Sequence, residues 1–278
     1  MDGDRLEHPA PQGMTLYYWP CSLLLLAPSL LLDRPTGPLA ATLRIACAEP
    51  YMIQVGERCI RTRVSLVAPK AKRKRIAAIG SEIALFYLPL ELPQYAGVRE
   101  LLAEEELQEL PVERFASVIP PLRRAMREVR PAAEIHALVQ QVVELLTGAP
   151  LAAPQPDPRV DKAMAVLDAM PLSEVSPAAV AKQVHLSSSR LRELFRAQTG
   201  FSMSDYARWA AVWRAAFLWK RGLTMTEVAH QAGFHDLAHA DRAFTALFGM
   251  NPSKVVDPKY VTLVNCGPPH PAEPTLTP

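Results

Sequence analysis

Short apolar segments separated by polar turns follow one another between Leu16 and Leu90. In places apolar and polar residues alternate, as over Arg61–Leu66. This two-residue period is typical of strands with one buried face. Many short strands at this spacing predict a small β-sandwich or barrel, with strands at Ser22–Leu26, Leu39–Cys47, Met52–Val55, Arg61–Val67 and Glu82–Leu88.

One apolar run, from Cys21 to Leu32, resembles a signal peptide or a membrane segment. Pro28 interrupts it, the residues before it are acidic, and it is shorter than the roughly 20 residues that a membrane-spanning helix needs. We therefore interpret the run as buried strand and expect no membrane association.

Beyond Pro93 the apolar period becomes helical, and helices are expected over Ala96–Leu107, Val112–Val129 and Ala132–Leu146. The last of these carries an apolar stripe formed by Ile135, Leu138, Val142 and Leu145. Two interpretations remain open for the stripe. It can form the contact of a homodimer, or it can pack on the sheet of its own domain.

A proline-rich segment over residues 149–158 can neither continue a helix nor join a sheet, so it marks a domain boundary. We expect an α+β chain. An N-terminal sensor or dimerisation domain occupies residues 1–148, with a loose tail over 1–13. After the linker at 149–158, an all-helical domain follows over 159–257, and a flexible tail over 258–278.

Two blocks of the helical domain have the same pattern: a capped short helix, a turn and a second helix. In the first, Ser176 and Pro177 start a short helix, and Ser187 starts a second helix. In the second, Thr224 and Glu227 form a capping-box pattern, and Gly233 makes the turn. Each block predicts a helix-turn-helix unit, although a plain helical bundle is the alternative. A linker helix of about 27 Å would separate the units by nearly one turn of B-DNA, ~34 Å.

Residues Leu172–Val256 resemble the DNA-binding domain of the AraC/XylS family of transcription regulators. The matching residues are Ala181, Leu186, Ser187, Leu191, Phe195, Gly200, Tyr206, Ala215, Thr226–Ala229, Ala232–Phe234, Arg242–Phe244, Phe248, Gly249, Pro252 and Ser253. The resemblance implies a sequence-specific transcription regulator, commonly an activator that contacts RNA polymerase. Its N-terminal domain would bind an effector or form a homodimer.

By the same resemblance, two recognition helices contact double-stranded DNA. The first presents Ser187, Ser188, Ser189, Arg190, Arg192 and Glu193, and the second presents Leu237, Ala238, Asp241 and Arg242. Arginine can bind guanine or phosphate, and serines at a helix N-terminus suit phosphate.

The chain departs from the family pattern at Glu193, Ala211, Ala240 and Asp241. The two carboxylates repel phosphate unless they accept a hydrogen bond from cytosine. A second hypothesis is therefore a regulator that acts through protein contacts and binds DNA weakly.

Five cations lie between Lys70 and Arg75. Here some relatives have a ligand-side turn of a cupin-like sensor, whose metal-binding histidine is absent. From Arg73 and Arg75 we expect an anionic small-molecule effector; the alternative is a solvated hairpin loop.

The other residues give few further indications of function. The net charge of +2 and the 49% hydrophobic content describe a globular chain and no polycation. Four cysteines without a CxxC pair favour a reducing cytoplasm. His235 and His239 have a metal-ligand spacing, but we expect no metal, no cofactor and no enzyme activity. Trp209 and Trp213, four residues apart, are expected in the core.

Overall fold

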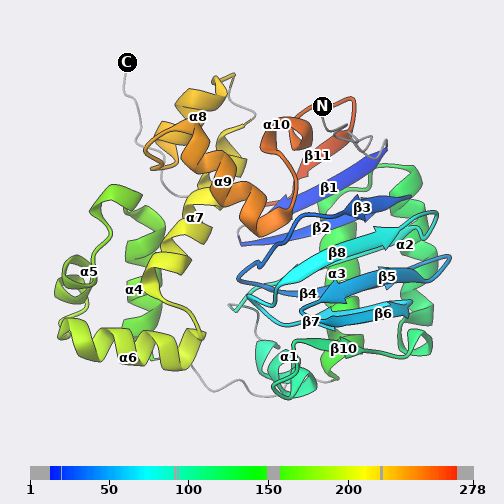
Figure 1. Ribbon diagram of the computed structural model, residues 1–278, viewed down its shortest axis with the longest axis horizontal. Coiled ribbons are helices and arrows are strands. Elements are labelled where there is room, and N and C mark those ends of the chain that lie inside the picture. The colour runs from blue at the N-terminus through cyan, green and yellow to red at the C-terminus, as the bar shows by residue number, and fades with distance from the viewer. Residues whose placement is uncertain are drawn as a thin grey trace, which may run out of the picture.

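The computed structural model describes residues 13–19, 21–90, 92, 94–148, 157–219 and 222–267. Within these ranges two β-sheets form the N-terminal domain, and a helical domain lies against them (Figure 1). The predicted α+β class is confirmed, with a β-rich domain followed by helices and then by two helix-turn-helix units.

The larger sheet contains seven of the described strands. Its neighbours pair antiparallel except for β1 and β11, which are parallel. The strand order is β10 (Leu107–Glu109), β7 (Val64–Val67), β4 (Ala41–Ala46), β9 (Ile83–Leu88), β2 (Ser22–Ala27), β1 (Met14–Trp19) and β11 (Val261–Asn265).

The smaller sheet faces one side of the larger one, and helices cover the other side (Figure 1). Its strand order is β3 (Leu30–Leu32), β8 (Arg73–Ala78), β5 (Tyr51–Val55) and β6 (Arg58–Thr62). The covering elements are α1 (Tyr95–Leu102), the 3-10 helix η1 (Val112–Val118), α2 (Ile119–Arg127) and α3 (Ala132–Thr147).

This layered arrangement explains the long apolar run near the N-terminus. Along β2, Leu24 and Leu26 pack on the helices of the N-terminal domain, whereas Leu23 and Leu25 belong to the opposite core, which is formed with the second sheet and with helices α7 and α9. A strand that is buried on both faces has no polar alternation. The run contains two strands in place of the single strand that we expected, because it turns at Pro28 and continues into β3 of the other sheet.

The basic run is likewise divided between two environments. A turn at Pro69–Lys70 precedes the strand, and Arg73, Lys74 and Arg75 lie in β8. The expectation that all five cations share one loop is therefore wrong. Arg73 is buried and only 1% exposed, whereas Arg75 is exposed.

The apolar stripe of α3 packs within its own domain. Ile135, Leu138 and Val142 are buried in the core between the larger sheet and its helices. The prediction that this stripe forms a dimer contact is wrong, because three of its side chains are buried in this core and Leu145 is packed against it. The first expected helix also ends early, at Leu102, and the chain then enters β10.

The helical domain follows the linker and ends in a strand. Its elements are α4 (Pro158–Ala169), the 3-10 helix η2 (Leu172–Glu174), α5 (Pro177–Gln183), α6 (Ser188–Thr199), α7 (Met203–Leu218), α8 (Met225–Gln231), α9 (Leu237–Phe248) and α10 (Pro252–Val255). No helix among those described is long and apolar enough to cross a membrane.

The expected flexible tail over 258–278 is wrong for residues 261–265. These residues form β11, which pairs in register with Met14–Tyr18 of β1. Val261 is 3% exposed and belongs to the core between the sheets. The expected loose tail over residues 1–13 lies outside the described residues apart from Gly13, as does the linker at 149–156.

The strand pairing yields a first prediction. Removal of residues 258–278 should lower the free energy of unfolding by about 2 kcal/mol or more, because it exposes the apolar side chains beneath β11. Thermal unfolding followed by circular dichroism measures the change. A chain that lacks only residues 268–278 is the control, and equal melting temperatures for the two truncations would contradict a structural role for β11.

Candidate nucleic-acid interface

The first helix-turn-helix unit consists of α5 and α6. The Ser176 side chain caps α5 by accepting a hydrogen bond from the Ala179 amide at 3.1 Å. At the turn, His185 has a φ of +55°, and the Leu186 amide donates to the Ala181 carbonyl at 3.0 Å. Ser187 then caps α6. These local contacts set the angle between the two helices, so that Leu191 and Phe195 of α6 are buried.

The opposite face of α6 carries the residues predicted to meet DNA. All of them are exposed except Ser188, which is half-buried. Arg190 donates to Glu193 at 3.0 Å, and the Arg192 Nε donates to the Ser188 carbonyl at 3.2 Å. Glu193 therefore neutralises one of the two arginines that could bind a phosphate. The exposed face of α6 therefore carries little net positive charge.

The second unit consists of α8 and α9. Thr224 and Glu227 form the predicted capping box. Gly233 has a φ of +91° at the turn, and a Cβ there would lie 3.2 Å from backbone atoms of Pro171 and Leu172, so only glycine fits without strain. Asp236 caps α9 by accepting from the His239 amide at 2.6 Å.

On α9 only part of the predicted set is fully exposed. Ala238 and Arg242 are exposed, whereas Leu237 and Asp241 are half-buried. Leu237 and Asp241 also line a small cavity next to Phe244, inside the unit. Arg242 is thus the cation of α9 that is free to reach into a groove.

The two histidines on this segment differ in environment. His235 is exposed and lies 3.1 Å from the Asp236 carboxylate, and the His239 ring packs edge-on against Phe234. In the part of the chain that the structure describes, no group of three potential ligands could hold a metal ion.

Helix α7 joins the two units and spans about 24 Å at 1.5 Å per residue. Trp209 and Trp213 are buried as expected, with their rings 5.4 Å apart in a T-shaped contact. Arg214, which sequence reasoning missed, donates to the carbonyls of Asp168, Met170 and Ala232. One guanidinium therefore binds the C-terminal end of α4, which packs on the first unit, and the turn of the second unit.

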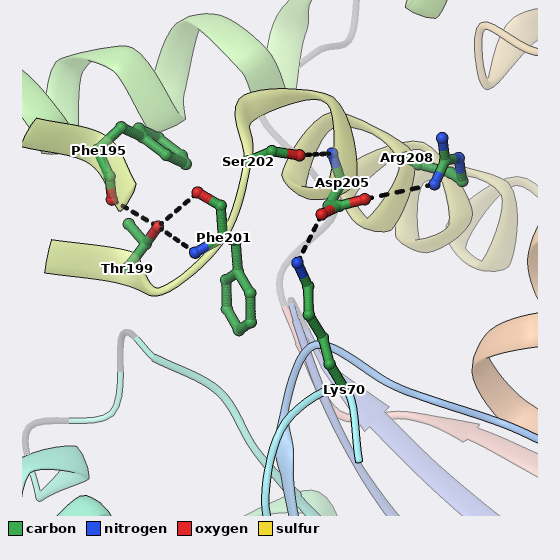
Figure 2. A network of polar contacts seen from close by, with 7 residues as sticks. All are labelled: Lys70, Phe195, Thr199, Phe201, Ser202, Asp205 and Arg208. Atoms are coloured by element: carbon green, nitrogen blue, oxygen red, sulfur yellow. Dashed lines mark hydrogen bonds and ion pairs between the residues drawn. The ribbon is translucent and has the colours of Figure 1, made fainter. Parts of the chain in front are cut away.

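The start of α7 is also held by the N-terminal domain (Figure 2). Lys70 donates to the Asp205 carboxylate at 2.6 Å, and its ammonium lies 5.2 Å from the centre of the Phe201 ring. Arg208 lies 3.6 Å from the same carboxylate. The cation expected to sit in a solvated loop thus contacts the helical domain. Sequence offered no signal for this pairing, because the two residues are 135 positions apart.

Asp168 lies near the C-terminal end of α4, close to Tyr206 and Arg214 of α7. Burial raises the pKa of Asp168 to about 6, although the Tyr206 hydroxyl and Arg214 both act to lower it. The carboxylate is ionised at neutral pH at a cost to folding.

Comparison with known proteins agrees with this geometry. A family model described as "Helix-turn-helix domain" matches residues 180–257. The HTH-type transcriptional activators RhaR of Salmonella arizonae and of Salmonella newport are each 35% identical over 77 residues, which is 27% of this chain and 27% of each relative. The match therefore spans about a quarter of the length of these curated relatives.

Solved structures share the fold over most of the chain. A ligand-free variant of ToxT from Vibrio cholerae has a TM-score of 0.57 at 9% identity, covering 85% of this chain and 97% of that chain. ToxT bound to (E)-4-(8-methylnaphthalen-1-yl)but-3-enoic acid has a TM-score of 0.51 at 10% identity, with 87% and 97% covered. At these identities the likeness establishes a common fold.

The buried carboxyl group yields a second prediction. Since the pKa of Asp168 is higher in the folded chain than its unfolded value of about 3.9, the folded state binds more protons between these values. Stability should fall as pH rises from about 4 to about 6. Asp168→Asn should remove this component and stabilise the chain at pH 7.5 by about 2 kcal/mol.

Urea unfolding at pH 5 and pH 7.5 measures the effect, with Asp161→Asn, an exposed carboxylate of the same helix, as control. Parallel stability curves for Asp168→Asn and the unaltered chain would contradict the assignment.

Proposed function

We propose that this chain, whose C-terminal domain is a helix-turn-helix domain of the AraC/XylS family, regulates transcription by binding specific DNA sequences. The supporting observation is the pair of recognition helices, α6 and α9, on one scaffold. Each helix has an exposed residue in its first turn, Ser189 in α6 and Ala238 in α9, and Arg214 joins α4, which packs on the first unit, to the turn of the second unit. Helices presented in this way can enter successive major grooves.

The contacts with DNA divide into two kinds. Ser187 and Ser189 lie at the N-terminus of α6, where backbone amides and the helix dipole favour phosphate. Arg192 and Arg242 are long enough to reach guanine edges, which carry sequence information. We assign positioning to the serines and base recognition to the arginines.

The proposal includes activation of transcription, as the name of the RhaR relatives suggests, and we propose RNA polymerase as the partner in that activation. It also includes a small-molecule effector, because a ToxT structure of the same fold contains a small carboxylic acid. With DNA as its partner, the chain would act in the cytoplasm. A homodimer stays in the proposal, but it must form through a surface other than the buried stripe of α3.

A second candidate function is a regulator that works mainly through protein contacts. It is favoured by the ion pair between Arg190 and Glu193 and by the carboxylate of Asp241, which together reduce attraction to phosphate. Recovery of genomic fragments bound to the purified chain, followed by sequencing, separates the two. Enrichment of a common sequence, with affinity that falls steeply with salt, supports DNA binding, whereas uniform recovery supports the second candidate.

The exposed arginine of α9 yields a third prediction. Arg242→Ala should weaken binding to a selected DNA site by ~1–3 kcal/mol and relax the preference at one base pair. Arg127→Ala removes an exposed arginine from α2 and should leave binding unchanged. Fluorescence anisotropy with labelled DNA measures both. An affinity for DNA that is the same in folded Arg242→Ala as in the unaltered chain would show that α9 does not read the site.

The ion pair on α6 yields a fourth prediction. Glu193→Gln should strengthen DNA binding several-fold, because it removes a negative charge and frees the Arg190 guanidinium for phosphate. The dependence of affinity on salt should become steeper. Glu100→Gln, on the exposed side of α1, makes the same charge change far from α6. Weaker binding by Glu193→Gln would instead assign Glu193 a direct contact with a base.

A further inference from the structure

The helical domain is joined to the N-terminal sheets by a strand at its C-terminal end. Strand β11 begins after α10 and pairs in parallel with residues 14–18 of β1. The helix-turn-helix family model ends at residue 257, before this strand begins. The strand is therefore an addition to the helix-turn-helix units, and it belongs to the sheet of the other domain.

The contacts of β11 extend beyond its five paired residues. The Met14 amide donates to the Tyr260 carbonyl at 3.3 Å, and the Cys266 amide donates to the Tyr18 carbonyl at 2.8 Å. Val261 packs in the core formed by the sheets, α7 and α9, whereas Cys266 is buried in the core beneath the helices of the N-terminal domain. The segment is therefore anchored on both faces of the sheet.

The connection from the second recognition helix to β11 is short. Helix α10 follows α9 almost directly, and its Val255 is 1% exposed in the same core as α9. Residues 256–260 then lead to β11, and a segment of that length spans at most about 18 Å. Part of it is a turn, since the Tyr260 and Val261 amides both donate to the Asp257 carbonyl. Helix α9 therefore cannot move far from the sheets while β11 stays paired.

The sheets also hold the C-terminal end of α9 directly. The Gly37 amide donates to the Ala246 carbonyl at 3.1 Å, and the Tyr87 hydroxyl donates to the Leu247 carbonyl at 3.4 Å. This end of α9 faces the N-terminal domain, whereas the other end, where Ala238 is exposed, points away from it (Figure 1). The N-terminal domain therefore holds α9 at the end that does not meet DNA.

The first unit is attached to the N-terminal domain less firmly. Lys70 donates to the Asp205 carboxylate, and Arg99 donates to the Gln198 carbonyl at 3.3 Å. Both contacts lie at the surface, where an ion pair contributes little to stability. The buried apolar side chains of α6 belong to a separate core. The N-terminal domain therefore holds the two recognition helices unequally.

We propose that β11 is a positioning element for DNA recognition. It joins the N-terminal sheets and the second helix-turn-helix unit into one body, and this body sets the direction in which α9 enters a groove. The inference rests on the proposed DNA-binding regulator, and it adds a determinant of specificity outside the helix-turn-helix units. Two consequences follow. The half-site beneath α9 is read only while β11 is paired, and β11 stays paired when the chain binds DNA.

A matched pair of variants in β11 tests the first consequence. Val261→Asp places a carboxylate in the core, where an unpaired charge is strongly unfavourable, and it should release the strand. Thr262→Asp makes the same change at an exposed side chain and should leave the strand paired. Hydrogen exchange of the β11 amides shows whether the strand is released.

DNA binding is then compared between a selected site and sites with base changes in one half. Arg192→Ala and Arg242→Ala identify the halves beneath α6 and α9. In Val261→Asp the preference for the correct bases beneath α9 should fall at least fivefold, and the preference beneath α6 should stay within twofold of the unaltered chain. Thr262→Asp should keep both preferences. Equal losses in both halves would assign β11 a role in stability alone, and retention of both preferences by a released strand would likewise overturn the proposal.

A disulfide between β1 and β11 tests the second consequence. Thr15 pairs with Thr262, and neighbouring strands lie about 4.8 Å apart, within the range that a disulfide bridges. The oxidised double variant Thr15→Cys/Thr262→Cys should bind the site within twofold of its reduced form. Loss of binding on oxidation, restored by reduction, would show that β11 must leave the sheet and would overturn the proposal. This test remains decisive if Val261→Asp does not fold.

All binding measurements use the full chain and fluorescence anisotropy with labelled DNA. If the unaltered chain selects no DNA sequence, the proposed function fails and this inference fails with it. If the chain selects a sequence but release of β11 leaves the preference beneath α9 intact, this inference fails alone.

Discussion

The structure depends on one apolar core that continues from the N-terminal sheets into the DNA-binding domain. Tyr87 of β9 stacks on Trp209 of α7 at 6.2 Å, and Phe248 of α9 lies against both rings. Because these aromatic side chains would otherwise be exposed on each domain, neither domain completes its core alone. The Lys70–Asp205 ion pair and the Gly37–Ala246 backbone hydrogen bond lie at the edge of the same contact.

This shared core connects the two recognition helices to the N-terminal domain in different ways. Helix α6 belongs to a separate apolar cluster formed with α4, α5 and the first half of α7. Helix α9 is embedded in the core that includes the sheets. A change inside the N-terminal domain therefore reaches the second unit through the shared core. It reaches the first through α7 and Arg214 and through the hydrogen bond from Arg99 of α1 to the Gln198 carbonyl of α6. The two units have the same fold, but only the second shares an apolar core with the N-terminal sheets.

Local features of the sequence predicted much of this fold. Caps such as Ser176 and Thr224, the turn glycine Gly233 and the strand periodicity act over a few residues, and each was found where its pattern placed it. Contacts between distant residues were not predictable in this way. The sequence placed Arg73 and Arg75 in one basic run. In the structure the register between β5 and β8 shifts at Gln54 and Val55, so that Arg73 is buried and Arg75 is exposed. The Lys70–Asp205 pair and Arg214 depend on tertiary packing that no short window contains.

The parallel pairing of β1 with β11 has a consequence for how the chain is made. Met14 pairs with Val261, so the last strand joins a sheet whose other described members lie within the first 109 residues. During synthesis the ribosome releases the N-terminal strands long before residue 261, and domains fold as they emerge. The edge of β1 stays open until the whole DNA-binding domain has left the ribosome. The larger sheet is therefore completed only after the DNA-binding domain has been synthesised.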